Sequence, residues 1–290
     1  MYCPRLDHFV RFNPDGSVSR CGHMVSPPRF RSLEDMESSS WLADMREQML
    51  AGQWPVECKR CQETDPDSIR RYAEQLDSHT PRSDYLQVGG VLDNICNAAC
   101  MTCNENLSTR IGSLKYASFP IVKNIDRFRE LPKERIVHLD INGGEPSYSK
   151  DYRRLLDDLP PNLQTLRLNT NCSTVLTQLE DIARRGIKVT VTVSCDGIEA
   201  VHDLVRWPIT WSQWYENLLA YKRMPVVLNL WTTVSRLNQH DLPNIQKFAR
   251  DHDIDHAWAY LSEPWQLSVH NTDNQAAQEY IDQQRQLRGI

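Results

Sequence analysis

The sequence has no apolar run that approaches the roughly 18 residues of a membrane-spanning helix. Its first residues also lack the basic-then-apolar layout of a secretory signal peptide. Both absences argue against export or membrane insertion. We therefore expect a cytoplasmic protein with no membrane partner.

A dominant charge of one sign is also missing. The 290 residues include 33 Lys and Arg against 38 Asp and Glu, which gives a formal net charge of −5. A basic stripe that could follow a nucleic-acid backbone is not indicated, and no nucleic-acid partner is expected. A chain of this length can bury a full core, either as one large domain or as one domain with a smaller one.

Cysteine, by contrast, is plentiful. In a chain without an export signal, nine cysteines indicate a reducing compartment, where clustered thiols bind metal more often than they form disulfides. Cys96, Cys100 and Cys103 form a C-x3-C-x2-C run after the apolar residues 85–92. Three thiolates can hold an iron–sulfur cluster, but a four-iron cluster normally takes four protein ligands. One iron would then be open to another ligand; zinc or chance spacing are the alternatives.

From residue 85 onward, β-branched runs alternate with segments of helical period. We predict strands at residues 86–92, 135–141, 163–169, 188–194, 226–234 and 257–261. Helices are predicted at residues 148–159, 175–185, 211–223, 242–252 and 272–287. The strands recur at the spacing of βα units rather than of hairpins. The sequence thus predicts an α/β fold, a TIM-like partial (β/α)6 barrel, with its chemistry at the carboxyl ends of the strands.

Polar residues gather where three of these strands end. The second strand runs into Asn142-Gly143-Gly144-Glu145-Pro146, where two glycines permit unusual dihedrals and the proline fixes the exit direction. The third strand ends in Asn169-Thr170-Asn171-Cys172, and the fourth in Ser194-Cys195-Asp196-Gly197. Their order after the cysteine loop is more specific than any of the turns alone.

In this order the motifs resemble those of radical S-adenosylmethionine (radical SAM) enzymes, and the resemblance covers residues 85–264. It implies that Cys96, Cys100 and Cys103 ligate a [4Fe–4S] cluster whose open iron binds S-adenosylmethionine. It also implies cofactor-binding positions, namely Met101, Thr102, Gly143, Gly144, Glu145, Pro146, Asn169, Asn171, Ser194 and Asp196. Thr102 departs from the family pattern, in which an aromatic residue often precedes the last cysteine.

The activity implied by this resemblance is reductive cleavage of S-adenosylmethionine to a 5′-deoxyadenosyl radical, which abstracts hydrogen from a substrate. We expect an oxidoreductase-type reaction that oxidises or crosslinks a peptide; dehydrogenation or rearrangement of a small alcohol or sugar is the alternative. The expected electron donor is a low-potential protein such as a flavodoxin or ferredoxin. A non-catalytic zinc or iron–sulfur protein, serving interaction or electron transfer, is the rival hypothesis. No residue is assigned a catalytic role.

The first 80 residues do not follow the βα rhythm. A hairpin is predicted over residues 8–21, around a turn at residues 13–16, and a helix over residues 41–50. Cys3, Cys21, Cys58 and Cys61 could supply four thiolates, with His23 as a substitute ligand. The pattern resembles the auxiliary-cluster modules called twitch or SPASM domains, which usually follow the barrel, and it implies a second [4Fe–4S] cluster. A zinc site with the same ligands is the alternative.

These motifs divide the chain into three parts. We expect an auxiliary iron–sulfur module at residues 1–80, the barrel at 81–270 and a closing helix at 271–290. Cys172 and Cys195 belong to neither cysteine set. Each could face the substrate as a hydrogen-atom donor, but free cysteine is commonly buried, and we expect packing roles.

Overall fold

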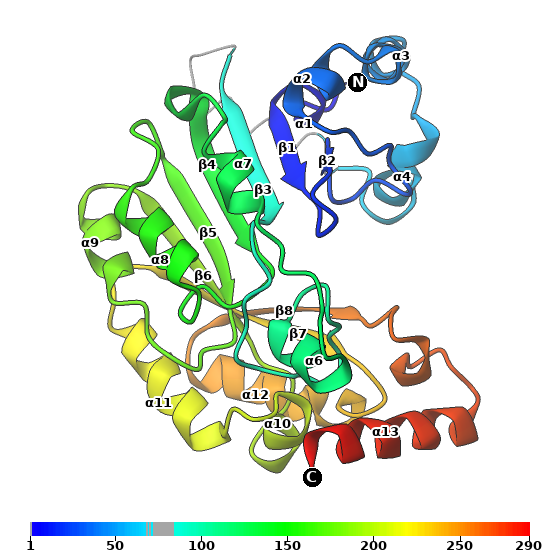
Figure 1. Ribbon diagram of the computed structural model, residues 1–290, viewed down its shortest axis with the longest axis vertical. Coiled ribbons are helices and arrows are strands. Elements are labelled where there is room, and N and C mark those ends of the chain that lie inside the picture. Colours follow the sequence, from blue (N-terminus) through cyan, green and yellow to red (C-terminus); the bar gives the residue numbers. More distant parts are fainter. Residues whose placement is uncertain (1, 68, 70, 72–83) are drawn as a thin grey trace. The chain divides into compact units, whose positions relative to one another are not determined.

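The computed structural model describes residues 2–67, 69, 71 and 84–290. Contacts divide the chain into two compact units (Figure 1). The first comprises Met1–Leu92, Lys123–Asn142 and Pro160–Gln164, and the second comprises Asp93–Val122, Gly143–Leu159 and Thr165–Ile290. The module boundary predicted at residue 80 lies outside the described residues, and the three-part division stays a prediction.

The first unit contains four neighbouring strands in the order β2-β1-β3-β4. Its strands are β1 (Phe9–Phe12), β2 (Val18–Ser19), β3 (Leu86–Val91) and β4 (Ile136–Asn142). Its α-helices are α1 (Arg5–His8), α2 (Leu33–Glu37), α3 (Ser40–Leu50), α4 (Lys59–Thr64) and α7 (Asn124–Phe128), with 3-10 turns η1 (Val56–Cys58) and η2 (Lys133–Arg135). Strands β1 and β2 form the predicted antiparallel hairpin, in which Arg11 pairs with Ser19 and Phe12 with Val18.

The hairpin does not stand apart from the βα strands, which the sequence pattern had not indicated. Strand β1 pairs in parallel with β3, with Phe9 opposite Gln87 and Phe12 opposite Gly90. At Gly90 the backbone has φ of +104°, and a Cβ atom there would lie 2.2 Å from the carbonyl oxygen of Phe12. Only glycine permits this close approach of the two backbones.

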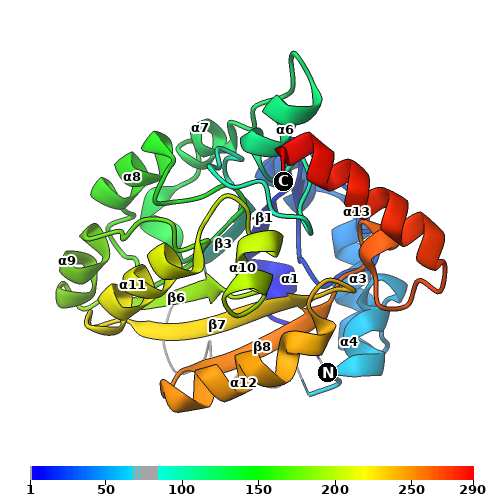
Figure 2. The same ribbon diagram turned by 90° about the horizontal axis from the view of Figure 1, so that it is seen from below.

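The second unit contains the parallel strands β5 (Thr165–Thr170), β6 (Lys188–Ser194), β7 (Val227–Val234) and β8 (Asp255–Tyr260), in that order. Its α-helices are α6 (Thr109–Lys115), α8 (Lys150–Asp157), α9 (Gln178–Arg184), α10 (Ala200–Val205), α11 (Trp211–Lys222), α12 (Leu242–Asp251) and α13 (Asn274–Arg288), with 3-10 turns η3 (Gln239–Asp241) and η4 (Trp265–Leu267). Helix α12 runs alongside β8 (Figure 2).

Side chains alternate between the two faces of these strands. On β6, Val189, Val191 and Val193 are buried, whereas Lys188 is exposed and Ser194 only half-buried. The buried face is the one expected to receive helices in a βα unit. Each strand from β3 to β8 is followed in the chain by at least one helix, so the predicted α/β class of (β/α)6 type is confirmed.

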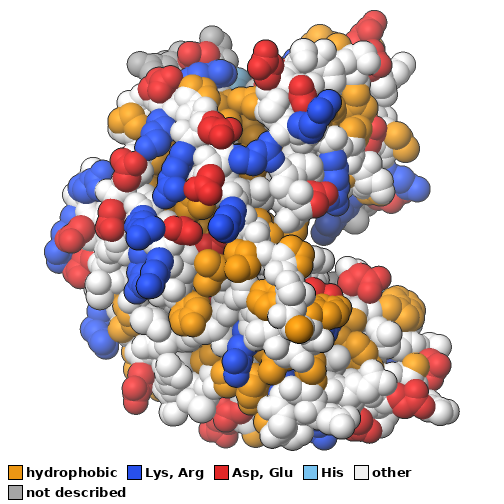
Figure 3. All heavy atoms as spheres, in the orientation of Figure 1, with side chains coloured by type: hydrophobic (Ala, Val, Ile, Leu, Met, Phe, Trp, Pro, Cys, Tyr) orange, Lys and Arg blue, Asp and Glu red, His pale blue; other side chains and the backbone are white. Residues whose placement is uncertain are grey.

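No helix among the described residues is long and apolar enough to cross a bilayer. On the face shown in Figure 3, acidic and basic side chains are interspersed. This distribution agrees with the small net charge of the sequence.

Candidate functional site

The cysteine loop after β3 is held by side chains within its own unit. Asn94 donates from Nδ2 to the carbonyl oxygens of Glu105 (3.4 Å) and Pro120 (3.2 Å) and accepts the amide of Val122 (2.9 Å). Ser108 donates from Oγ to the carbonyl oxygen of Ala98 at 2.6 Å. The loop therefore has a defined path without any ligand in it.

Helix α10 and the residues after it provide a second support. The amides of Ala99 and Met101 donate to the carbonyl oxygens of Trp207 and Val205, each at 2.8 Å. The Met101 side chain is fully buried in a cluster with Leu261 and Leu267. Thr102, which follows it, is half-buried. An adenine contact by either residue stays a prediction.

Cys96 and Cys100 are buried, and Cys103 is partly exposed. Burial raises the pKa of all three thiols, that of Cys103 to about 12, and the neighbouring cysteines raise the pKa of Cys96 and Cys103 further. The free thiols are therefore neutral, and a bound cationic group would be needed to hold them as thiolates.

The donors around these sulfurs fit an iron–sulfur cluster. Cys96 Sγ accepts the amide of Ala98 at 3.4 Å and faces Asn171 Nδ2 at 3.8 Å. Hydrogen bonds of this kind to cluster sulfurs tune the reduction potential, and in a [4Fe–4S] cluster each thiolate binds its own iron. Within residues 2–67, 69, 71 and 84–290, no group of three or more His, Cys, Asp or Glu is arranged for a single metal ion.

The glycine-rich turn lies against the cysteine loop. Gly144 donates its amide to Leu107 O (3.1 Å), and Glu145 donates to Ile95 O (2.8 Å). Gly143 and Gly144 have φ of +77° and +60°, which confirms the unusual dihedrals predicted for them. A Cβ atom on Gly144 would lie 2.7 Å from Asp93 Oδ1 and 2.9 Å from the carbonyl oxygen of Ile95, so the close packing requires glycine.

Glu145 connects the strand ends through its carboxylate, which is fully buried. Its Oε1 accepts from the amide (3.0 Å) and hydroxyl (2.6 Å) of Ser147 and from Thr170 Oγ1 (2.7 Å), and its Oε2 accepts the Asn171 amide (2.6 Å). Burial raises its pKa against the opposing effect of these hydrogen bonds. A carboxylate has about four acceptor positions, so the chain itself nearly fills Glu145, and its expected contact with the cofactor amine stays a prediction.

The expected positions on β5 and β6 are placed as follows. Asn171 Nδ2 also donates to Asn97 Oδ1 at 2.9 Å, so this residue lies at the cysteine loop. Asn169 lies one pleat earlier on β5, half-buried, and Pro146 is buried in the glycine-rich turn. Ser194 ends β6, and its carbonyl oxygen accepts from Trp214 Nε1 at 3.1 Å.

Asp196 is committed to a partner that the sequence did not reveal. Its Oδ2 forms an ion pair with Arg206 Nη1 at 3.0 Å, while Oδ1 accepts the amide of Thr233 at 2.8 Å. Burial alone would lower the pKa of Arg206, but the adjacent Cys100 and Asp196 raise it. Arg206 Nε is buried and has no hydrogen-bond partner among the described residues. A single Arg ten residues beyond Asp196 carries no local pattern that could have identified it.

Cys172 and Cys195 are both fully buried. The Cys172 thiol donates to the carbonyl oxygen of Trp214 (3.6 Å), and the Cys195 thiol donates to that of Gly197 (3.8 Å). Burial raises the pKa of both thiols. Inert packing fits these surroundings better than hydrogen-atom donation to a substrate.

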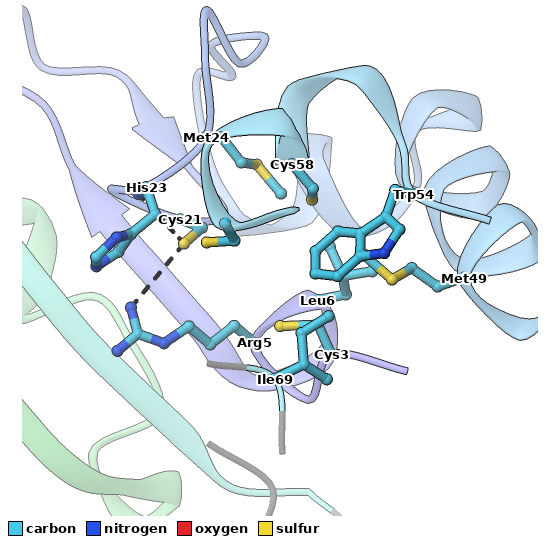
Figure 4. A pocket seen from close by; sticks show the side chains of 11 residues that line it. Cys3, Arg5, Leu6, Cys21, His23, Met24, Met49, Trp54, Cys58 and Ile69 are labelled. Carbon is cyan, nitrogen blue, oxygen red and sulfur yellow. Dashed lines mark hydrogen bonds between the residues drawn. The ribbon is translucent and has the colours of Figure 1, made fainter. Parts of the chain in front are cut away.

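The four remaining cysteines line one pocket of the first unit, with an empty volume of about 390 Å³ (Figure 4). The pocket is lined by Cys3, Cys21, Cys58 and Cys61 and by Arg5, Leu6, His23, Met24, Met49, Trp54 and Ile69. Burial, together with the neighbouring cysteines, raises the pKa of Cys3 to about 11 and that of Cys58 to about 12. Four thiols facing an apolar cavity are a donor set that fits either a [4Fe–4S] cluster or a structural zinc ion.

Cys21 has polar neighbours in this pocket. Arg5 Nη1 lies 3.9 Å from Cys21 Sγ, and the backbone amide of His23 donates to the same sulfur at 3.4 Å. Figure 4 shows the Arg5 and His23 side chains on the same side of the pocket as Cys21, with Trp54 on the opposite side. His23 thus contacts the sulfur through its backbone, and a role as ligand stays a prediction.

Comparison with known proteins gives structural matches only. No family model matches the sequence, and no curated protein does. Native anSMEcpe with bound AdoMet is 18% identical over 61% of this chain and 52% of that chain, with a TM-score of 0.46. Streptococcus suis SuiB is 13% identical over 89% of this chain and 63% of that chain, with a TM-score of 0.48, both bound to S-adenosylmethionine and bound to the precursor peptide SuiA. This chain therefore spans 52% and 63% of the lengths of these two proteins.

Proposed function

We propose that this chain is a radical SAM enzyme whose cluster is held by Cys96, Cys100 and Cys103. The observation that supports this most directly is the packing of the glycine-rich turn on the cysteine loop, through the Gly144 and Glu145 amides. A third strand end contributes through Asn171, which reaches Cys96. Three motifs that are far apart in the sequence meet at one set of thiols.

When bound, the cluster would supply the electron that cleaves S-adenosylmethionine. The chain's own residues would bind and orient that metabolite. In this proposal the turn at residues 143–146 lines its amino group, and Ser194 and Asp196 face its ribose or carboxylate. Arg206, paired to Asp196 through one nitrogen only, has guanidinium donors left for a carboxylate.

We propose further that the pocket formed by Cys3, Cys21, Cys58 and Cys61 holds a second [4Fe–4S] cluster. A full set of four thiolates leaves no iron open for a substrate, which suits electron transfer. An electron acceptor close to the chemistry favours oxidation, and a peptide is the proposed substrate. Reduction by a flavodoxin or ferredoxin in the cytoplasm completes this proposal.

The test is anaerobic reconstitution of the full chain, followed by iron and sulfide analysis and by assay of 5′-deoxyadenosine after reduction. Wild type should yield 5′-deoxyadenosine, and Cys96→Ser should reduce it to background because a cluster ligand is lost. Cys195→Ser, a buried cysteine outside both sets, is the matched control and should retain most of the activity. The double variant Cys58→Ser/Cys61→Ser should lose about half of the iron if both sites hold four-iron clusters.

Other results would contradict the proposal. Two zinc ions and no sulfide would favour the non-catalytic scaffold, and a loaded, reduced protein that makes no 5′-deoxyadenosine would reject the enzyme. For the substrate, a peptide product lighter by two hydrogens supports oxidation. An unchanged mass with an altered structure would favour a redox-neutral rearrangement.

A further inference from the structure

The last helix of the second unit brings a buried cation to the cysteine loop. Helix α13 begins after the N-cap Asp273 and ends at Gly289, whose φ of +71° is the left-handed conformation common after a helix. In its last turn Arg288 is only 6% exposed, whereas Arg285, three residues earlier, is exposed. The two arginines of one helical turn therefore have different surroundings.

All three guanidinium nitrogens of Arg288 are used. Its Nε donates to the carbonyl oxygen of Ala99 (2.6 Å) and Nη2 to that of Cys100 (3.2 Å). Its Nη1 donates to the backbone and side-chain oxygens of Gln284, both at 2.8 Å. Gln284 thus orients the guanidinium, and the guanidinium fixes two consecutive carbonyl groups of the cysteine loop.

The charge of Arg288 lacks an acidic partner in the part of the chain that the structure describes. The titratable groups that affect it are Cys100, Tyr280 and Cys103, and none of these is an acid at neutral pH. A buried cation without a counter-charge is costly. Thiolates at Cys100 and Cys103, as a bound cluster requires, would supply the missing negative charge.

We propose that Arg288 is a positioning residue of the cluster site, which fixes the loop carbonyls of Ala99 and Cys100 and compensates the negative charge of the thiolate-bound cluster. This inference rests on the proposed function, because it requires a cluster on Cys96, Cys100 and Cys103. A nearby positive charge favours the more negative, reduced state of a cluster. Arg288 is therefore expected both to strengthen cluster retention and to raise the reduction potential.

The experiment compares reconstituted wild type with Arg288→Met, Arg288→Lys and the exposed control Arg285→Met. The measurements are the midpoint potential of the cluster whose electron paramagnetic resonance signal changes on adding S-adenosylmethionine, and the rate of iron loss to a chelator. In Arg288→Met the midpoint should become more negative, and iron affinity should fall about 10- to 100-fold, as when an outer-shell partner is lost. Arg288→Lys should keep the midpoint near that of wild type but lose iron faster, and Arg285→Met should match wild type in both.

The outcomes separate the two proposals. If wild type binds no cluster that responds to S-adenosylmethionine, the proposed function fails. If wild type and Arg285→Met carry that cluster and both Arg288 variants have the same midpoint and iron retention as wild type, the role of Arg288 is rejected. Should Arg288→Met fail to fold, as judged by thermal unfolding of the cluster-free proteins, Arg288→Lys decides: a midpoint displaced from that of wild type contradicts the charge role.

Discussion

The two cysteine sites of this molecule solve the same problem of holding thiols in different ways. The site in the second unit has three cysteines in one loop, and backbone carbonyls from α10, the Gly144 turn and Arg288 hold that loop. The site in the first unit has four cysteines from separate segments around an apolar cavity. The first arrangement suits a cluster that must keep one iron accessible, and the second suits a cluster enclosed by protein ligands. The contacts around a thiol set thus differ with the work proposed for it.

The largest expected effect comes from adding a methyl group to the turn that supports the three-cysteine loop. Gly144→Ala would place Cβ within 2.9 Å of a backbone oxygen at a positive φ, so it should cost about 3 kcal/mol and displace the turn from the loop. We expect 5′-deoxyadenosine formation to fall to background while the four-cysteine site keeps its iron. Urea unfolding and iron analysis measure the two effects.

Gly186→Ala is the matched control for that substitution. Its φ is +89°, but nothing lies within 4 Å of the added Cβ, so only backbone strain of about 1 kcal/mol is expected, with activity retained. Equal losses of stability and activity in both variants would show that contact between the turn and the loop is not what matters.

Acid should weaken the three-cysteine site through His202. This residue is fully buried on α10, and burial followed by the charge of Arg206 lowers its pKa to about 3. The unfolded state takes up a proton near pH 6.5 and the folded state does not, so stability is complete above pH 6.5 and is lost as pH falls toward 3. Between pH 6.5 and 5 the loss should be about 2 kcal/mol.

The measurement is urea unfolding of the cluster-free protein at a series of pH values. His202→Leu removes the titrating group while keeping an apolar side chain, so its stability should fall less steeply over this range. A slope equal to that of wild type would mean that His202 does not control the acid sensitivity, and that other histidines of lowered pKa, such as His8 and His23, account for it.

The smallest effect is expected at the four-cysteine site. Arg5→Met removes the guanidinium 3.9 Å from Cys21 Sγ, and the midpoint of a cluster there should become slightly more negative because a positive charge is lost. Arg60→Met, an exposed arginine between Cys58 and Cys61 in sequence, is the control. A redox titration of the cluster that does not respond to S-adenosylmethionine tests this, and a shift in the three-cysteine site instead would contradict the separation of the two sites.

Local features of the fold were predictable from the sequence, and long-range ones were not. Runs such as residues 188–194 are β-branched throughout, and the strand β6 has those bounds. The six-residue helix α10 was missed because it is too short to show a helical period. The pairing of β1 with β3 was missed as well, because strand partners separated by some 75 residues leave no mark on local pattern.

The same division applies to the candidate site. Cysteine spacing and the two glycines of the turn are local, so they could be named in advance. Arg206 and Arg288 reach the loop from positions about 100 and 190 residues away, and only the folded chain shows them there. Glu145 was named, but its saturation by Ser147, Thr170 and Asn171 depends on three segments meeting.

The parallel pairing of β1 with β3 has a consequence for how the chain tolerates shortening. Residues 9–12 cover backbone amides and carbonyls of β3 that would otherwise be unsatisfied along an open strand edge. A protein made without its first 30 residues would present that edge to other copies of itself. Self-association, rather than simple loss of one metal centre, is what such a truncation should bring about.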